Sequence, residues 1–372
     1  MTEEIAAAVL NKAPGRLDLA RLVLDAPGPH EVRIRVAYAG LCHSDLHEID
    51  GTFDTTVPIV LGHEASGVVE AVGNEVTDVS PGDVVVTCPS ASCGVCAYCM
   101  VGRQTLCVRR EALTQQRPSA RLTTLDGQPV RASAGVGAFA EKIVVHRSMV
   151  VAIAQGVPLD VASVLGCAVT TGMGAVLRSA GVRACQTVAV IGLGGVGMAA
   201  VLAARLSGAR RIIGIDVQDA KLGKAKSLGA TDIVNARAED PVATVRELTG
   251  GGVDHAFEAV GAGKTVGQAF AMLRPGGAAT VMGMVPDAQA IPLTGAELFA
   301  QEKQLRGSFM GSNHFKIDVP QYLELRAQGR LPLDELVTDR VKFEDINDGF
   351  ELLASGTATR VVAQVGDVSV SI

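Results

Sequence analysis

The stretch TVAVIGLGGVG at residues 187–197 places a run of uncharged, mostly β-branched residues directly before a cluster of glycines. Such a run predicts a buried strand, and the small residues at 196–207 predict a helix after the turn. In a G-x-G-x-x-G turn, Gly192 permits the tight bend, Gly194 lets the backbone approach a pyrophosphate, and Gly197 lets the helix pack closely on the strand. Because the start of a helix offers free N–H groups to phosphates, the stretch predicts a dinucleotide site.

The chain beyond this turn alternates between predicted strands and helices. Strands at this spacing predict right-handed βαβ units and a parallel sheet. Asp216 ends the second strand, where its carboxylate can accept hydrogen bonds from both ribose hydroxyls of a dinucleotide; a helix-capping role is the alternative. After the strand at 187–191, further strands are predicted at 211–216, 231–234, 253–259 and 278–284, and a helix at 221–228.

The first 150 residues have a different sequence pattern, which predicts short strands separated by turn residues. Residues 31–36 alternate between apolar and charged side chains, and 67–72 and 83–86 are further apolar runs bounded by glycine or proline. This pattern predicts a β-rich, partly barrel-like domain. The tail after residue 310 is too short to fold alone, and we expect it to return to the first domain. Its predicted elements are helices at 319–328 and 343–353 and strands at 336–341 and 360–365.

Composition narrows the class of protein. The chain has 372 residues, of which 48% are hydrophobic and 19% charged, with a formal net charge of −6. This length suggests two domains, the apolar content excludes a disordered chain, and no basic stripe favours nucleic-acid binding. Residues 187–204 carry no charge, but the glycine turn inside them favours a buried strand and helix over a membrane span. With no readable signal peptide and few cysteines, we expect a cytoplasmic protein with reduced thiols.

Four cysteines lie within a short segment in the spacing Cys93-x2-Cys96-x2-Cys99-x7-Cys107. A compact loop of this kind can bring four thiolates to a tetrahedral zinc ion at about 2.3 Å. Four unrelated buried cysteines are the alternative. Because every position would be filled by sulfur, we expect a structural zinc rather than a catalytic one.

A second group of soft ligands is scattered along the chain. Cys42, His63 and Cys167 could supply two thiolates and an imidazole, which leaves a fourth position open, as in a catalytic zinc site. They span 125 residues, so spacing alone favours a core histidine for His63.

Taken together, these motifs resemble the zinc-dependent medium-chain alcohol dehydrogenases, from about residue 40 to residue 360. The resemblance rests on the glycine turn, the four-cysteine lobe and three short motifs. These are Gly40-Leu41-Cys42-His43-Ser44-Asp45, Gly62-His63-Glu64, and Cys167 before Thr171-Gly172.

The resemblance implies an α/β fold with a β-rich GroES-like catalytic domain and a Rossmann domain with a doubly wound parallel sheet. The catalytic domain would comprise residues 1–168, with the zinc lobe at 93–107, and be completed by the return segment 310–372. The Rossmann domain would comprise residues 169–309 and bind NAD.

The resemblance also assigns roles to single residues. Two zinc ions per subunit are implied, the catalytic one on Cys42, His63 and Cys167 with Glu64 close behind. Asp45 would orient the ligand histidine, and the proton relay would be Ser44 and His47. The nucleotide would contact Gly192, Gly194, Gly195, Gly197, His43 and Arg360 near the pyrophosphate, Thr171 and Val196 near the nicotinamide, and Asp216 and Lys221 at the adenosine ribose. An apolar substrate pocket would include Phe53, Pro89, Met284 and Phe309. Cys88 and Cys185 match no ligand and are expected to be small buried side chains.

The implied activity is oxidation of a primary aliphatic, allylic or aromatic alcohol to the aldehyde or ketone with NAD, and the reverse reaction. Oxidation of thiol-adducted formaldehyde is an alternative. Glu111 stands where such enzymes carry an arginine, which argues against it, but Arg109 and Arg110 lie close to that position in the sequence. A nicotinoprotein that recycles bound NAD is another, and a non-catalytic zinc protein regulated by a nucleotide is a third. Segments 114–136 and 278–309 favour a homodimer, with a tetramer as the competitor. We expect no partner beyond a small-molecule substrate, neither nucleic acid nor membrane.

Overall fold

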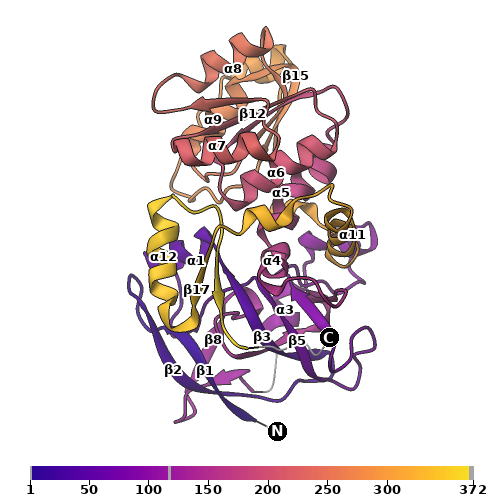
Figure 1. The fold of residues 1–372 in the computed structure, drawn as a ribbon, viewed down its shortest axis with the longest axis vertical. Helices are drawn as coiled ribbons and strands as arrows, with labels where there is room; N and C mark the ends of the chain where they lie inside the picture. The colour runs from indigo at the N-terminus through magenta and orange to yellow at the C-terminus, as the bar shows by residue number, and fades with distance from the viewer. Residues whose placement is uncertain (1, 116–118, 368–372) are drawn as a thin grey trace. The chain divides into compact units, whose positions relative to one another are not determined.

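The computed structural model describes residues 2–115 and 119–367, which form two compact units (Figure 1). Unit 1 contains the chain up to Cys167, His314–Glu324 and the residues from Leu333 onward. Unit 2 contains Ala168–Asn313 and Leu325–Pro332. That the segments 1–168, 169–309 and 310–372 behave as folding domains stays a prediction.

Unit 1 is built on two β-layers, which confirms the predicted β-rich fold. A closed barrel has the order β1-β2-β7-β8-β4, and a mixed sheet has the order β10-β6-β5-β3-β18-β17, with β9 also paired to β3. The strands of the barrel are β1 (Glu3–Leu10), β2 (Leu17–Leu24), β4 (Ile59–Val60), β7 (Leu122–Thr123) and β8 (Pro129–Ala132). Those of the mixed sheet are β3 (Glu31–Leu41), β5 (Ala65–Val72), β6 (Val84–Thr87), β9 (Lys142–His146), β10 (Val150–Ala152), β17 (Asp339–Lys342) and β18 (Val361–Gln364).

Strand β3 shows how the sequence pattern makes this unit. Val32, Ile34 and Val36 are fully buried, whereas Arg33 and Arg35 between them are partly exposed. This alternation has the two-residue period of a strand with one face on the core. The end of strand β3 lies beside the C-terminal segment of the chain, because β18 pairs antiparallel with it.

Most of the return segment belongs to unit 1, including the yellow helix α12 (Ile346–Ser355) beside the indigo strands (Figure 1), whereas residues 310–313 and 325–332 belong to unit 2. The strand predicted at 336–341 begins later, because Leu333–Leu336 form a 3-10 turn and β17 starts at Asp339. The two leucines of that turn are buried at a spacing of three residues, which suits a 3-10 turn and not a strand. The predicted helix at 319–328 is α11 (Phe315–Ala327).

Unit 2 is a six-stranded, entirely parallel sheet with the order β13-β12-β11-β14-β15-β16. Its first strand, β11 (Thr187–Ile191), has the predicted limits, and helix α6 (Gly195–Leu206) follows the glycine turn. The later elements are β12 (Arg211–Asp216), α7 (Asp219–Leu228), β13 (Asp232–Asn235), α8 (Pro241–Thr249), β14 (Val253–Glu258), α9 (Gly263–Ala271), β15 (Leu273–Val281), α10 (Gly295–Ala300) and β16 (Gln304–Gly307).

Two apolar segments of the chain were candidates for a helix that spans a membrane. The uncharged residues 187–204 are a strand, a turn and most of a helix in unit 2. Among the described residues, no single helix is long and apolar enough to cross a membrane, and one bent pair, Leu159–Gly166 with Ala168–Ala180, passes by length and composition only.

Candidate active site and metal centres

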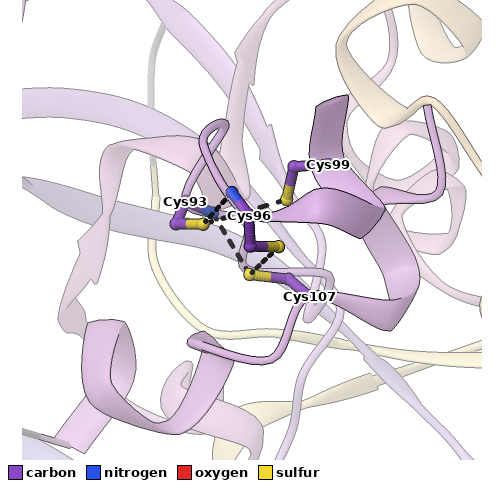
Figure 2. A group of neighbouring side chains, drawn as sticks. All are labelled: Cys93, Cys96, Cys99 and Cys107. Atoms are coloured by element: carbon purple, nitrogen blue, oxygen red, sulfur yellow. Dashed lines mark hydrogen bonds between the residues drawn. The ribbon is translucent and has the colours of Figure 1, made fainter. Parts of the chain in front are cut away.

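The four cysteines of the lobe converge in the structure, with their sulfurs turned toward one another (Figure 2). The Sγ atoms of Cys93 and Cys99 lie 4.0 Å apart, and so do those of Cys96 and Cys107. Four thiolates around a tetrahedral zinc ion at about 2.3 Å have sulfurs separated by about 3.8 Å. The lobe therefore fits a zinc ion with four sulfur ligands.

Backbone N–H groups support the thiolates of the lobe. The N–H of Cys96 donates to Cys93 Sγ at 3.3 Å, and those of Cys93 and Arg109 donate to Cys107 Sγ at 3.3 and 3.4 Å. A backbone hydrogen bond from Cys99 lowers the pKa of the Cys96 thiol to about 6. Burial raises the pKa of Cys99 to about 12, so a metal binding here must displace a proton from that thiol.

The second cluster assembles from three parts of unit 1. Cys42 lies between β3 and helix α1 (His43–Ile49), His63 and Glu64 lie between β4 and β5, and Cys167 follows the turn Val164–Gly166. Their ligand atoms all lie within 4.8 Å of one another. The structure thus brings together the residues that sequence spacing alone could not connect.

Gly166 explains how Cys167 reaches this place. A Cβ atom on Gly166 would lie 1.8 Å from the carbonyl oxygen of Thr87, at the end of β6. No side chain fits at that distance, so glycine allows the turn to press against the strand. Cys167 is consequently held near the carboxyl end of β6, close to His63.

Asp45 holds the cluster from behind and is fully buried. Its Oδ1 atom lies 3.2 Å from His63 Nδ1 and accepts a hydrogen bond from the N–H of Gly62 at 3.0 Å. Its Oδ2 atom accepts from the N–H of Cys42 at 3.2 Å. Because Nδ1 of His63 is engaged by the carboxylate, Nε2 is the nitrogen left for a metal.

Glu64 is fully buried and forms an ion pair with Arg360, which is also buried. Sequence reasoning placed Arg360 at a pyrophosphate and missed this pair. The signal was available, since a buried glutamate next to a ligand histidine requires a cation. Nε of Arg360 and Oε2 of Glu64 have no hydrogen-bond partner among the described residues. A contact between Arg360 and a nucleotide stays a prediction.

The charges within this cluster are strongly coupled. The hydrogen bond with Cys167 holds the pKa of the Cys42 thiol well below its ordinary value and raises that of Cys167. Burial lowers the pKa of His63, but the charge and hydrogen bond of Asp45 outweigh burial and raise it overall. Burial raises the pKa of Glu64 to about 7, against the opposing charge of Arg360. Two cysteine sulfurs and an oriented imidazole form a donor set that suits zinc.

The predicted relay residues lie on helix α1 beside the cluster. Ser44 Oγ is 3.4 Å from His63 Nε2, which places the hydroxyl beside the nitrogen that is left for a metal. His47 packs its ring edge-on against Phe53 at 5.1 Å, and its Nδ1 atom lies 3.9 Å from Asp50 Oδ2. His43 is exposed on the first turn of the same helix.

The glycine turn of unit 2 has the shape that a pyrophosphate requires. Gly192 has φ +87°, which side chains rarely adopt, and a Cβ atom on Gly197 would lie 1.8 Å from the carbonyl oxygen of Gly192. By contrast, a Cβ on Gly194 would meet nothing within 4 Å. The turn is therefore tight where helix and strand meet and open where a phosphate would approach the helix start, beside Gly195 and Val196.

Asp216 is placed at the adjacent strand end. Its Oδ2 accepts a hydrogen bond from the N–H of Leu193 at 2.7 Å, and Oδ1 accepts from those of Val217 and Gln218 at 2.7 and 3.0 Å. Oδ2, which has one donor, keeps acceptor capacity for a ribose hydroxyl. Lys221 is buried on α7, and Thr171 is buried on α5 (Ala168–Gly174).

The four predicted pocket residues are divided between the units. Phe53 and Pro89 belong to unit 1, and Met284 and Phe309 belong to unit 2, where their side chains are half exposed. That the four residues share a pocket stays a prediction.

The two remaining cysteines differ from each other. Cys88 is fully buried, as predicted. The prediction for Cys185 is wrong, because this residue is exposed, with φ 68° in the turn before β11.

Known proteins resemble the chain along its whole length. Residues 28–155 match the model of the alcohol dehydrogenase GroES-like domain, and residues 195–328 match that of the zinc-binding dehydrogenases. The chain is 36% identical to alcohol dehydrogenase 2 of Zea mays over 97% of both sequences. Among solved structures, an alcohol dehydrogenase zinc-binding domain protein from Burkholderia ambifaria is 33% identical, with a TM-score of 0.94 over 99% of this chain and 100% of its own. Benzyl alcohol dehydrogenase from Acinetobacter calcoaceticus is 30% identical, with a TM-score of 0.91 over 98% and 100%.

Proposed function

Because the chain belongs to the zinc-dependent medium-chain alcohol dehydrogenase family, we propose that it oxidises a primary aliphatic, allylic or aromatic alcohol with NAD, and catalyses the reverse reaction. The observation that carries this proposal is the cluster of Cys42, His63 and Cys167, with Asp45 fixing the imidazole. Three protein ligands leave a position open for a substrate oxygen.

The two clusters would hold two zinc ions with different tasks. The four-cysteine lobe has no open position, so its ion would stabilise the fold. The ion held by Cys42, His63 and Cys167, when bound, would supply a Lewis acid that lowers the pKa of an alcohol hydroxyl. Glu64, neutralised by Arg360, would lie behind this ion without adding net charge to the site.

The protein's own groups would guide the proton and the hydride. Ser44 would accept the hydroxyl proton, since its Oγ lies 3.4 Å from His63 Nε2 in the cluster, and His47 would pass it to solvent. The glycine turn and Asp216 would hold NAD, which would supply the hydride acceptor.

The assembly and location extend this proposal. We propose a cytoplasmic homodimer, since Leu298 and Phe299 on α10 expose apolar surface that a second copy could cover; Phe299 is 87% exposed. The other segment that favours a dimer, 114–136, includes residues 116–118, which lie outside the described residues. Sedimentation showing a monomer at micromolar concentration would contradict the dimer.

The test combines a substrate panel with metal analysis. The purified protein is offered hexanol, an allylic alcohol, benzyl alcohol and thiol-adducted formaldehyde with NAD, and reduced nicotinamide is followed by absorbance. We expect turnover with at least one simple alcohol and two zinc ions per chain. One zinc ion and no turnover would favour a non-catalytic zinc protein. Turnover of the thiol adduct alone would favour the formaldehyde activity, and nicotinamide absorbance in the protein as purified would favour a nicotinoprotein.

A further inference from the structure

Glu258, the last residue of β14, is a buried carboxylate that the reaction above does not use. Its side chain is 0% exposed, and no cationic side chain pairs with it in the part of the chain that the structure describes. A buried charge without a counter-ion is costly. Its presence at this strand end therefore points to a role.

The hydrogen bonds of Glu258 fit the ionised form. Oε1 accepts three hydrogen bonds, from the N–H groups of Val260 and Gly261 at 2.9 and 2.8 Å and from the hydroxyl of Thr265 at 2.7 Å. Oε2 has no hydrogen-bond partner among the described residues. A proton on Oε2 would be a buried donor without an acceptor, whereas a carboxylate ion only accepts.

Gly283 lies close to Oε2 and leaves no room for a side chain at its own position. The carbonyl oxygen of Glu258 accepts from the N–H groups of Met282 and Gly283 at 2.8 and 3.1 Å. A Cβ atom on Gly283 would lie 2.2 Å from the nitrogen of Gly261 and 2.7 Å from Glu258 Oε2. The backbone of Glu258 thus bonds to the segment after β15, which ends at Val281, so residues 282–284, predicted as strand, lie outside the sheet.

The position of Glu258 in the sheet relates it to a bound dinucleotide. Strands β11 and β14 are neighbours, and the chain order runs outward in opposite directions from them. Open parallel sheets bind ligands at the carboxyl ends of the strands at such a point. With the adenosine ribose at Asp216 on β12 and the pyrophosphate at the turn after β11, the nicotinamide half falls on the side of β14.

Resting on the proposed use of NAD, we propose that the buried charge of Glu258 makes the site prefer the oxidised nicotinamide ring. The ring of NAD⁺ is positively charged and that of NADH is neutral, so a fixed anion on this side attracts only the former. The pyrophosphate is common to both forms, and its repulsion cancels in the ratio of their affinities. Burial strengthens the effect because the surroundings of Glu258 screen little.

The experiment measures dissociation constants without turnover. NADH binding is followed by the fluorescence of the reduced ring, and NAD⁺ binding by calorimetry. In Glu258→Gln we expect the ratio Kd(NAD⁺)/Kd(NADH) to rise about fivefold or more. Glu258→Asp keeps the charge and should keep the ratio near that of the wild type. Thr265→Val removes one hydrogen bond to Oε1 but no charge, and should change both constants by the same factor.

A second variant tests the charge without touching the buried carboxylate. Val260 is 51% exposed on the turn that Glu258 holds, so Val260→Lys adds a cation there with little effect on folding, and Val260→Gln is its neutral control. We expect the lysine variant alone to raise the ratio. Equal weakening of NAD⁺ and NADH in Glu258→Gln, or an unchanged ratio in Val260→Lys, would overturn the inference and leave the proposed function intact. A wild-type protein that binds neither nucleotide would instead refute the use of NAD.

Discussion

Oδ1 of Asp45 lies 3.2 Å from Nδ1 of His63, and both side chains are buried. The same carboxylate accepts hydrogen bonds from the N–H groups of Cys42 and Gly62. One side chain therefore connects two segments that each carry a ligand of the cluster. It also fixes the imidazole so that Nε2 is available to a metal.

Asp45→Asn should weaken zinc at this cluster about 10- to 100-fold, because an amide has one acceptor oxygen where two are used. Chelator competition on the purified protein measures the loss, and the zinc of the cysteine lobe should be unaffected. The exposed Asp54→Asn, on the loop after the same helix, is the matched control. Equal zinc affinity in the wild type and Asp45→Asn would show that the carboxylate does not support the ligands.

Cys42→Ala and Cys96→Ala should have opposite primary effects. The first removes a ligand from the open site, so we expect loss of turnover and of one zinc ion per chain with the fold retained. The second opens the structural lobe, and we expect a lower melting temperature first, since structural zinc contributes folding free energy. Zinc analysis, kinetics and thermal unfolding distinguish the two. Full activity in Cys42→Ala, or a stable Cys96→Ala protein with both metals, would contradict the assignment.

His47→Gln should lower the rate of alcohol oxidation about tenfold at pH 6 and less at pH 9. The relay loses its terminal base, and hydroxide in solvent can replace that base only at high pH. The pH–rate profile of kcat measures this, with Asp50→Asn as a control that alters the neighbour of His47 but keeps the base. A profile unchanged from that of the wild type would show that water carries the proton.

Local features were predictable from the sequence, and distant contacts were not. The limits of β11 followed from five uncharged residues bounded by glycine, and the lobe followed from cysteines within 15 residues. The cluster of Cys42 and Cys167 required the family resemblance, because spacing along the chain says nothing about contacts across 125 residues. The pair of Glu64 and Arg360, separated by 296 residues, depends on β18 pairing with β3 and was missed.

The cofactor choice should be decided at Asp216. With NAD, this carboxylate can accept two hydrogen bonds from ribose hydroxyls, each worth about 1.5–3 kcal/mol where water is excluded. With NADP it would face a phosphate with about two negative charges, and attraction would become repulsion. Asp219 adds a further negative charge nearby, and Val217 and Gln218 offer no cation to bind the phosphate. We therefore expect kcat/KM to favour NAD by at least a hundredfold, or about 3 kcal/mol.

Two variants remove the charge of Asp216 with different losses of structural bonds. Asp216→Asn removes the charge and replaces one acceptor oxygen by an amide NH2, so the backbone N–H groups at that oxygen lose their acceptor; NADP should improve while NAD loses about one hydrogen bond. Asp216→Gly also removes the bonds to Leu193, Val217 and Gln218, which shape the turn, and should erode the preference mainly by weakening NAD. Lys221 remains in both variants and would then be free to approach the 2′-phosphate. Initial rates with both nucleotides at saturating alcohol measure the preference. Comparable efficiency with NAD and NADP in the wild type would mean that Asp216 does not face the ribose.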